Sequence, residues 1–168
     1  MKKSLVAFVP IILLFSCYSP PRVETFGPDA ISKIDQVRIE SIDFYSDTDF
    51  TKPMPRHEYM DTAREEIHLN AKKFLPLYGM NLMNLLDKAD ANALVVKGDV
   101  CIQPSIVGVG LKLRAKVFLK DTYLFEVVGT AVSPPSYAEI KKLQAELAEK
   151  IIAAFAKKLG REKLNPPK

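Results

Sequence analysis

The chain has 168 residues, of which 48% are hydrophobic and 9% are aromatic. This length and composition exclude wholesale disorder and provide one hydrophobic core, but not two full domains. Its 24 Lys and Arg against 20 Asp and Glu give a formal net charge of +4. No concentrated basic face with interleaved aromatic residues accompanies that charge, so the sequence argues against a nucleic-acid partner.

The start of the chain has the pattern of an export signal. Lys2 and Lys3 provide a positive beginning, and residues 5–15 form an apolar run that only Pro10 interrupts. This run is too short to cross a bilayer, which needs roughly 20 helical residues. A short apolar run after a positive start is typical of a cleaved signal peptide. We therefore predict that residues 1–16 are removed and that the mature protein is exported.

The tetrapeptide Leu14-Phe15-Ser16-Cys17 resembles the lipobox of bacterial lipoproteins, in which a leucine, two small residues and a cysteine mark the cleavage site. Leu14, Ser16 and Cys17 match this pattern, and Phe15 is larger than the usual residue. The resemblance implies that the Cys17 sulfur receives a diacylglycerol and that the new amine is acylated, which gives stable membrane attachment. Tyr18 replaces the Asp that retains enterobacterial lipoproteins in the inner membrane, so the resemblance favours the outer membrane, on its periplasmic side. The residues leave two alternatives open: a secretory signal with Cys17 as a bystander, or a buried first helix.

The rest of the chain divides into a tether, a domain and a tail. Residues 17–34 contain three prolines and predict a short extended tether. Residues 35–160 carry the alternating and helical patterns of a single α/β domain. The last residues, 161–168, end in Asn165-Pro166-Pro167-Lys168, which predicts a disordered tail.

The first half of the domain predicts a strand, a loop and a helix. Apolar residues within 36–45 switch from one face to the other midway, which indicates a bulge or burial on both sides. Residues 46–55 are polar and contain two prolines, so they form a loop. Apolar residues at spacings of three and four predict a helix over 56–75, which Pro76 and Gly79 end.

The second half predicts three strands and a long helix. Residues 80–90 are ambiguous and fit a short strand that runs into a helical turn. Period-two alternation then predicts three strands, at 94–102, 107–119 and 123–132. The tight connection between the last two strands predicts a hairpin. Ser136 and Glu139 form a capping box at the start of the last helix, and Gly160 ends it.

This element order predicts an α/β (α+β) fold, a two-layer sandwich with two main helices on one face of a mixed, mostly antiparallel sheet. The order, together with the stretch Ala93-Leu94-Val95-Val96-Lys97-Gly98-Asp99-Val100, is similar to the small α/β domain of the curli-secretion lipoprotein and of the lipoprotein activators of penicillin-binding proteins. The resemblance concerns the fold and assigns no functional role to a residue of this chain.

We predict no catalytic, metal or cofactor site. His57 and His68 are separated by about 16 Å along the predicted helix, which is too far for one metal ion. The three aspartates within 43–49 lack the glycine and the terminal glutamate of a calcium loop. With Cys17 acylated, Cys101 has no second cysteine and no nearby histidine, so we expect a buried, inert thiol. The protein is therefore expected not to be an enzyme.

Four aromatic residues are candidates for a partner surface. Phe44, Tyr45 and Phe50 flank the acidic loop, and Phe118 lies on the polar side of its strand. Aromatic side chains rimmed by charge are common at protein interfaces. Packing beneath a helix or beneath the loop is the alternative that the same positions leave open.

The sequence supports two functional hypotheses. The first is a membrane-anchored lipoprotein whose periplasmic domain binds or scaffolds an envelope protein, as an assembly, secretion or cell-wall accessory factor. The second is a periplasmic module that binds a small molecule or a lipid in a pocket between sheet and helices, lined by Phe74, Tyr78, Met80 and Met83. Neither hypothesis calls for a cofactor, and both leave homo-oligomerisation open.

Overall fold

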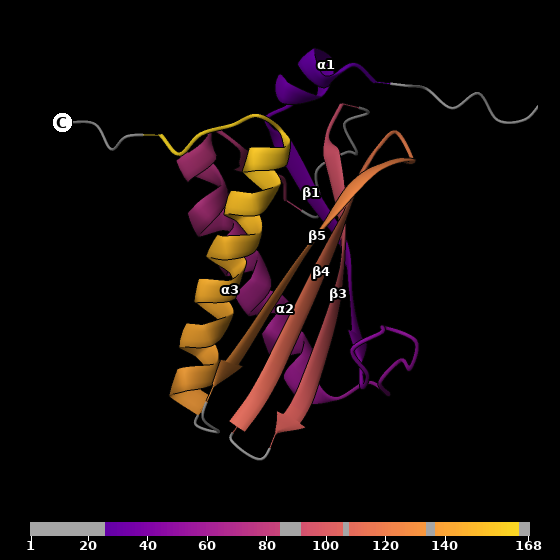
Figure 1. Cartoon of the computed structure of the whole chain (residues 1–168), viewed down its shortest axis with the longest axis vertical. Helices are drawn as coiled ribbons and strands as arrows, with labels where there is room; N and C mark the ends of the chain where they lie inside the picture. The colour runs from indigo at the N-terminus through magenta and orange to yellow at the C-terminus, as the bar shows by residue number, and fades with distance from the viewer. Residues whose placement is uncertain (1–25, 85–91, 106–107, 134–136, 165–168) are drawn as a thin grey trace, which may run out of the picture.

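The computed structural model describes residues 26–84, 92–105, 108–133 and 137–164. It has a mixed five-stranded sheet with the two main helices, α2 (Glu58–Phe74) and α3 (Tyr137–Lys158), packed on one face (Figure 1). The predicted α/β two-layer sandwich is confirmed. The described residues contain no helix that is long and apolar enough to span a membrane.

The strand order across the sheet is β2-β1-β3-β4-β5. The strands run over Gln36–Tyr45 (β1), Asn81–Leu82 (β2), Leu94–Ser105 (β3), Gly108–Leu119 (β4) and Thr122–Ser133 (β5). Strand β1 is parallel to β2 and to β3, whereas β3, β4 and β5 form an antiparallel meander. The sheet is therefore mixed, and its antiparallel half follows directly from the short connections between consecutive strands.

The predicted irregularity in β1 is a bulge. The pairing of β1 with β3 shifts between Ile39 and Ser41. Because of this shift, Val37 and Ile39 before the bulge and Ile42 and Phe44 after it all lie in the hydrophobic core. One extra residue thus restores the apolar side chains to the helix-covered face, where a regular strand would turn them away.

The predicted hairpin is confirmed, with Lys120 and Asp121 between β4 and β5. Both residues have positive φ angles, 47° and 64°. Consecutive left-handed residues are the requirement of the two-residue turn whose twist matches that of paired strands. The pairing of β4 with β5 shifts once beyond the turn, between Val117 and Phe118, and the register after that shift places Leu113 and Ala115 of β4 on the same face as Val127 of β5.

The core fills the space between the sheet and the two helices. Its sheet side is provided by alternate residues of β1, β3, β4 and β5, and its helix side by α2, α3 and the 3₁₀ helix η1 (Leu75–Tyr78). Gly79 follows η1 with a φ of 66° and turns the chain into β2, as the predicted helix stop requires.

The structure differs from the predicted domain boundaries at both ends. Within the predicted tether, helix α1 (Pro28–Ser32) forms, and Ile31 and Ile34 pack against the core. Within the predicted tail, Arg161 is tied to earlier segments by hydrogen bonds, and the backbone N–H of Leu164 donates to the Leu77 carbonyl over 2.7 Å. Long-range contacts of this kind leave no local pattern in the sequence.

Several predictions fall outside the described residues. These are the signal peptide over 1–16, the acylation site Cys17, Ser136 of the capping box, and the last four residues, 165–168. They stay predictions from the sequence.

Candidate functional site

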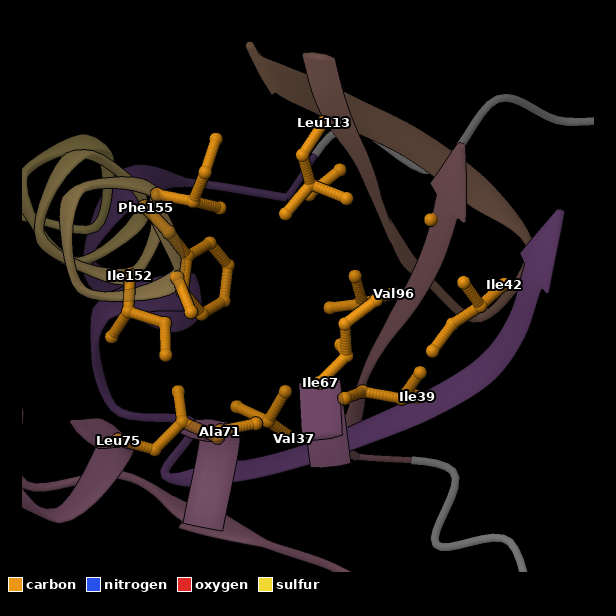
Figure 2. A pocket seen from close by; sticks show the side chains of 14 residues that line it. Val37, Ile39, Ile42, Ile67, Ala71, Leu75, Val96, Leu113, Ile152 and Phe155 are labelled. Atoms are coloured by element: carbon orange, nitrogen blue, oxygen red, sulfur yellow. The ribbon is translucent and has the colours of Figure 1, made fainter. Parts of the chain in front are cut away.

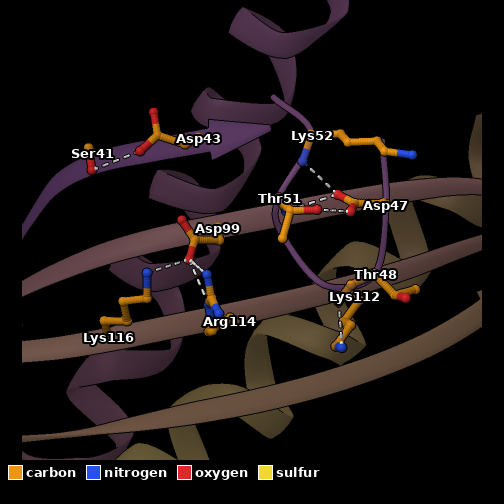
Figure 3. A network of polar contacts seen from close by, with 10 residues as sticks. All are labelled: Ser41, Asp43, Asp47, Thr48, Thr51, Lys52, Asp99, Lys112, Arg114 and Lys116. Atoms are coloured by element: carbon orange, nitrogen blue, oxygen red, sulfur yellow. Dashed lines mark hydrogen bonds and ion pairs between the residues drawn. The ribbon is translucent and has the colours of Figure 1, made fainter. Parts of the chain in front are cut away.

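Helices α2 and α3 cover one face of the sheet, and we call the opposite face the open face. The strand register assigns to it the alternate residues that do not enter the core. Strand β4 contributes three cations to this face in succession, Lys112, Arg114 and Lys116, followed by Phe118. Figure 3 looks onto the open face, with the helices behind the strands.

A buried carboxylate lies at the centre of the open face. Asp99 of β3 has 4% of its surface exposed. Its Oδ2 lies 2.5 Å from Nη2 and 2.7 Å from Nε of Arg114, and 3.0 Å from Nζ of Lys116 (Figure 3). A carboxylate withdrawn from water needs such partners, because its desolvation costs several kcal/mol. No role for Asp99 was predicted from the sequence, although its place within an apolar strand was a signal of burial.

The loop over residues 46–55 folds back onto the open face, and Phe50 anchors it there. The Phe50 side chain is buried although its backbone has a positive φ of 57°. Its ring meets the Tyr45 ring edge-on at 5.6 Å, and the Arg114 guanidinium lies 4.1 Å from its centroid. Lys112 Nζ donates to the Thr48 carbonyl over 2.7 Å. These contacts outweigh the cost of the left-handed conformation, which is unfavourable for a bulky residue.

The Asp47 side chain stabilises the same loop through hydrogen bonds to other residues of the loop. Its carboxylate accepts hydrogen bonds from the Thr51 hydroxyl, from the Thr51 backbone N–H over 3.0 Å and from the Lys52 backbone N–H over 2.9 Å. The Thr51 hydroxyl and the Lys52 N–H are the main causes that lower the pKa of Asp47 below its usual value. Asp47 therefore has a structural use as the acceptor that shapes the loop. Within the described ranges, no three His, Cys, Asp or Glu side chains gather as a metal site would require.

Cys101 lies on the open face, opposite Tyr45 in the pairing of β1 with β3, and is fully buried. Burial raises the pKa of its thiol, and the nearby Asp47 carboxylate raises it further. The expectation of a buried thiol is confirmed. A protonated, inaccessible thiol is a poor nucleophile.

The four aromatic residues proposed for a partner surface lie in three environments. Phe44 is in the core on the helix-covered side, with the Arg64 guanidinium 5.1 Å from its ring. Tyr45 and Phe50 meet under the loop. Phe118 is half-buried and lies six positions away along β3, about 20 Å from Tyr45. The structure thus joins only Tyr45 and Phe50, and it packs Phe44 and Phe50 away from solvent.

The exposed apolar residues of the domain gather instead on strand β5. Of the five large hydrophobic side chains exposed in the described residues, three belong to β5: Tyr123, Val128 and Val132, at 52%, 47% and 63%. Their partners in β4 are Phe118, Arg114 and Gly110, so all three lie on the open face. Strand β5 is last in the sheet order, and no described strand pairs with its outer edge. We call Tyr123, Val128, Val132 and this free edge the β5 edge surface.

The β5 edge surface was not predicted from the sequence, because strand order cannot be read from alternation. The signal that was present is the run Phe125-Glu126-Val127-Val128, in which apolar residues occupy both faces of a strand. On a central strand this pattern indicates burial on both sides. On an edge strand with one open face it leaves Val128 in solvent.

A cavity of about 70 Å³ lies between the sheet and the helices, at the level of the predicted pocket. Its lining is entirely apolar, with Ile39, Val96, Leu113 and Phe155 among the residues whose side chains point into it (Figure 2). An apolar cavity of about 150 Å³ can bind benzene, and this one has about half that volume.

The residues expected to line that pocket do not line this cavity. Phe74, Tyr78 and Met80 are buried in the core beside it. Met83 borders a separate open groove along α2, together with His68 and Leu69. The cavity therefore gives no support to the predicted lining of a binding pocket.

Comparisons with known proteins find similarity at the level of structure alone. No protein-family model matches the chain, and no curated protein matches it significantly. Solved structures that are similar to it include the following three. The PelC dodecamer from Paraburkholderia phytofirmans is 14% identical, with 71% of this chain and 86% of that chain covered and a TM-score of 0.46. A minor lipoprotein from Acinetobacter baumannii is 12% identical, with 79% and 98% covered and a TM-score of 0.44. The rare lipoprotein B from Shewanella oneidensis is 15% identical, with 70% and 94% covered and a TM-score of 0.27.

These are distant similarities to lipoproteins, in which the arrangement of elements is partly shared and the sequence is not. At this level of superposition they assign neither a function nor a partner to the present chain.

Proposed function

We propose that the chain is a non-enzymatic lipoprotein of the cell envelope, anchored to the outer membrane through acyl chains on Cys17, whose domain binds an envelope protein in the periplasm. The anchor rests on the signal and the lipobox-like tetrapeptide that ends at Cys17. The observation that carries the binding role is the β5 edge surface, where exposed apolar side chains line one face of a strand with a free edge.

A free strand edge is a binding element because it presents unpaired backbone N–H and C=O groups to an incoming strand. Proteins usually protect such an edge with charge, proline or a bulge. In β5, the pairing with β4 shifts once, between Val117 and Phe118 close to the turn, and the strand beyond that shift pairs regularly. The open-face positions between Tyr123 and Val132 include one charged residue, Glu126, which faces Lys116 of β4. The exposed apolar residues on this edge are the feature that marks an interaction site on a soluble domain.

The charged residues of the open face support a binding role over a catalytic one. Asp99 is held by Arg114 and Lys116, and Lys97 pairs with Glu40 at 3.0 Å. Asp99 and Glu40 are thus engaged with neighbouring cations, which stabilises the sheet that carries β5. Such a face is a rigid platform beside the free edge.

Site-specific photocrosslinking in the producing cells tests this proposal. A photoreactive amino acid is placed at Val128 or Val132, and at Lys142 or Glu146 as matched controls on the exposed side of α3. We expect a discrete crosslinked envelope protein from the β5 positions and none from α3. Crosslinks to the same protein from both elements, or none from β5, would contradict the proposed surface. A dimer of this chain as the crosslinked product would identify self-association.

The anchor has its own test, the intact mass of the protein purified from membranes. We expect a chain that begins at Cys17 and carries two or three acyl groups, which a Cys17→Ala variant loses. An unacylated chain in the soluble fraction would contradict the anchor without bearing on the β5 edge surface.

A further inference from the structure

The fold places one end of the domain next to the predicted tether. Phe26 is the first described residue, and Lys120 Nζ lies 5.8 Å from its ring centroid. The turn between β4 and β5 is therefore at the end of the domain where the tether from Cys17 enters. Figure 1 places α1 and the C-terminal ends of α2 and α3 at this same end. We call it the tether end.

Exposed lysines gather at the tether end. They come from the segment after α1, the last turns of α2 and α3, and the β4–β5 turn: Lys33, Lys72, Lys73, Lys120, Lys157 and Lys158. None of the six has an ion pair with another described residue. The exposed acids described at this end are fewer: Asp29, Asp35, Asp121 and Glu162.

The loop over residues 46–55, at the opposite end of the domain, has no such excess. It carries Asp47 and Asp49 against Lys52, and Arg56 directly after it pairs with Asp61. The mature chain would have 22 basic and 20 acidic side chains after loss of Lys2 and Lys3. A nearly neutral protein thus concentrates positive charge at the end where it would meet a membrane.

Helix electrostatics explain part of this pattern. Cations in the last turn of a helix interact favourably with its dipole, by a few tenths of a kcal/mol. This interaction explains why Lys72 and Lys73 lie at the end of α2, and why Lys157 and Lys158 lie at the end of α3. It does not account for Lys120 in a strand turn, nor for the gathering of four separate elements at the end that carries the tether.

We infer that the tether end binds the anionic phospholipid headgroups of the membrane that holds the acyl chains of Cys17. The inference rests on the proposed anchor. Residues 17–26 span at most about 30 Å when fully extended, so the anchor keeps the lysines within reach of the bilayer. Basic residues near an anionic surface are attracted to it, and the attraction decays over about 8 Å at physiological ionic strength.

This binding would orient the domain relative to the membrane. With the tether end on the membrane, the strands stand away from the bilayer, and the loop over 46–55 points into the periplasm (Figure 1). The β5 edge surface then runs outward from the membrane, open to a partner along its length.

Vesicle sedimentation tests the inference without the acyl chains. The probe is a vesicle of phosphatidylcholine with or without phosphatidylglycerol, and the protein is the chain from residue 17 with Cys17→Ala. We expect binding to the anionic vesicles at low salt, loss of binding at high salt, and little binding to phosphatidylcholine alone. The double variant Lys157→Gln with Lys158→Gln is expected to bind about 30-fold more weakly, because each lysine contributes about fivefold.

The matched control is Lys52→Gln with Arg56→Gln, which removes the same charge from the opposite end and is expected to bind like the parent. Absence of binding to anionic vesicles, equal binding to both vesicle types, or an equal loss in both double variants would each overturn the inference. Thermal unfolding midpoints confirm that the variants are folded. Because this protein is unacylated and no partner is present, a negative result here leaves the mass and crosslinking tests unaffected.

Discussion

The guanidinium of Arg161 donates to the carbonyl oxygen of Gly79 over 2.7 Å, across 82 positions of the sequence. The same side chain donates to the carbonyls of Tyr78, Ser32 and Ile34, at 3.3, 2.8 and 2.8 Å. Its planar fork thus joins the chain after α3 to the end of α1 and to the end of η1. The negative ends of backbone dipoles here surround a cation, as at the C-terminus of any helix.

We predict that Arg161→Ala lowers the free energy of unfolding by about 2–4 kcal/mol, because several charge-assisted hydrogen bonds are lost and carbonyls are left unpaired. Arg161→Lys keeps the positive charge but lacks the planar guanidinium group. It is therefore expected to recover less than half of the unfolding free energy that Arg161→Ala loses. Urea unfolding measures both. The control is Lys163→Ala, whose exposed pair with Glu149 contributes less than about 1 kcal/mol. An Arg161→Ala variant as stable as this control would contradict the stabilising role of the Arg161 hydrogen bonds.

Arg161 illustrates where prediction from the sequence ends. Patterns that repeat within a few residues predicted the β1 strand with its bulge, the β4–β5 hairpin and the helix stop at Gly79, since local sterics and alternation determine them. The partners of Arg161 are 82 to 129 positions away, so residues 161–164 were predicted to be a tail. A contact of that range depends on tertiary packing, which no local window contains.

The features of the open face also differ in how far the sequence predicted them. The cationic alternation of β4 was visible in the sequence. Which strand has a free edge depends on sheet order, which a single sequence does not contain, so Val128 and Val132 were not identified. The burial of Phe50 was equally hidden, because its contacts with Arg114 and Tyr45 arise only when the loop folds onto the sheet.

Removal of the Asp99 charge should be more costly than removal of an exposed one. Asp99→Asn leaves Arg114 and Lys116 close together without a carboxylate. We predict a loss of about 2–4 kcal/mol in unfolding free energy, at or just below the range for a broken buried pair, because Lys116 is one-third exposed. Glu40→Gln, which breaks the exposed pair with Lys97, is expected to cost under about 1 kcal/mol.

The cause of that loss can be separated by a second substitution. If unpaired cations produce it, Lys116→Met in the Asp99→Asn background should restore part of the stability, because one of the two adjacent cations is removed. A further loss in the double variant would show instead that Lys116 stabilises the strand through other contacts. Chemical denaturation of the four species of this cycle gives the coupling directly.

Two strand glycines on the helix-covered face are predicted to respond to alanine in opposite directions. Gly98 lines the apolar cavity, and a Cβ there would meet Ile42 Cγ1 and the Ser41 carbonyl oxygen at 3.6 Å, an ordinary contact. A Cβ at Gly129 would lie 2.8 Å from Leu147 Cδ1 and 2.9 Å from Ile151 Cδ1. We expect Gly98→Ala to stabilise the protein by about 0.5–1 kcal/mol and Gly129→Ala to destabilise it by about 1–3 kcal/mol through overpacking.

Thermal and urea unfolding of both alanine variants check this pair. Each variant serves as the control for the other, since both remove backbone freedom from the unfolded chain by the same substitution. Equal effects of the two changes would mean that the helices adjust freely over the sheet. They would also remove the basis for treating the cavity at Gly98 as a fixed feature of the core.

The loop over 46–55 should control access to Cys101. Burial raises the pKa of this thiol, so at neutral pH it is protonated, and alkylation requires the loop to open. Phe50→Ala removes the ring that contacts Tyr45 and Arg114. In a Cys17→Ala background, we predict that it speeds alkylation of Cys101 by at least about tenfold, which corresponds to a loss of about 1.4 kcal/mol in closing the loop. Tyr123→Ala, an exposed aromatic on the same face, is the control and should leave the rate unchanged.

The dependence of the alkylation rate on urea identifies the motion. Opening of the loop exposes little surface, so the Phe50→Ala rate should change only slightly with low urea, whereas exposure by complete unfolding rises steeply with it. A steep dependence in the parent and in the variant, with rates that follow global stability, would contradict the loop as the cover. Cys101 would then become accessible only when the whole sheet unfolds. In that case Phe50 would stabilise the whole domain and would not act on the loop alone.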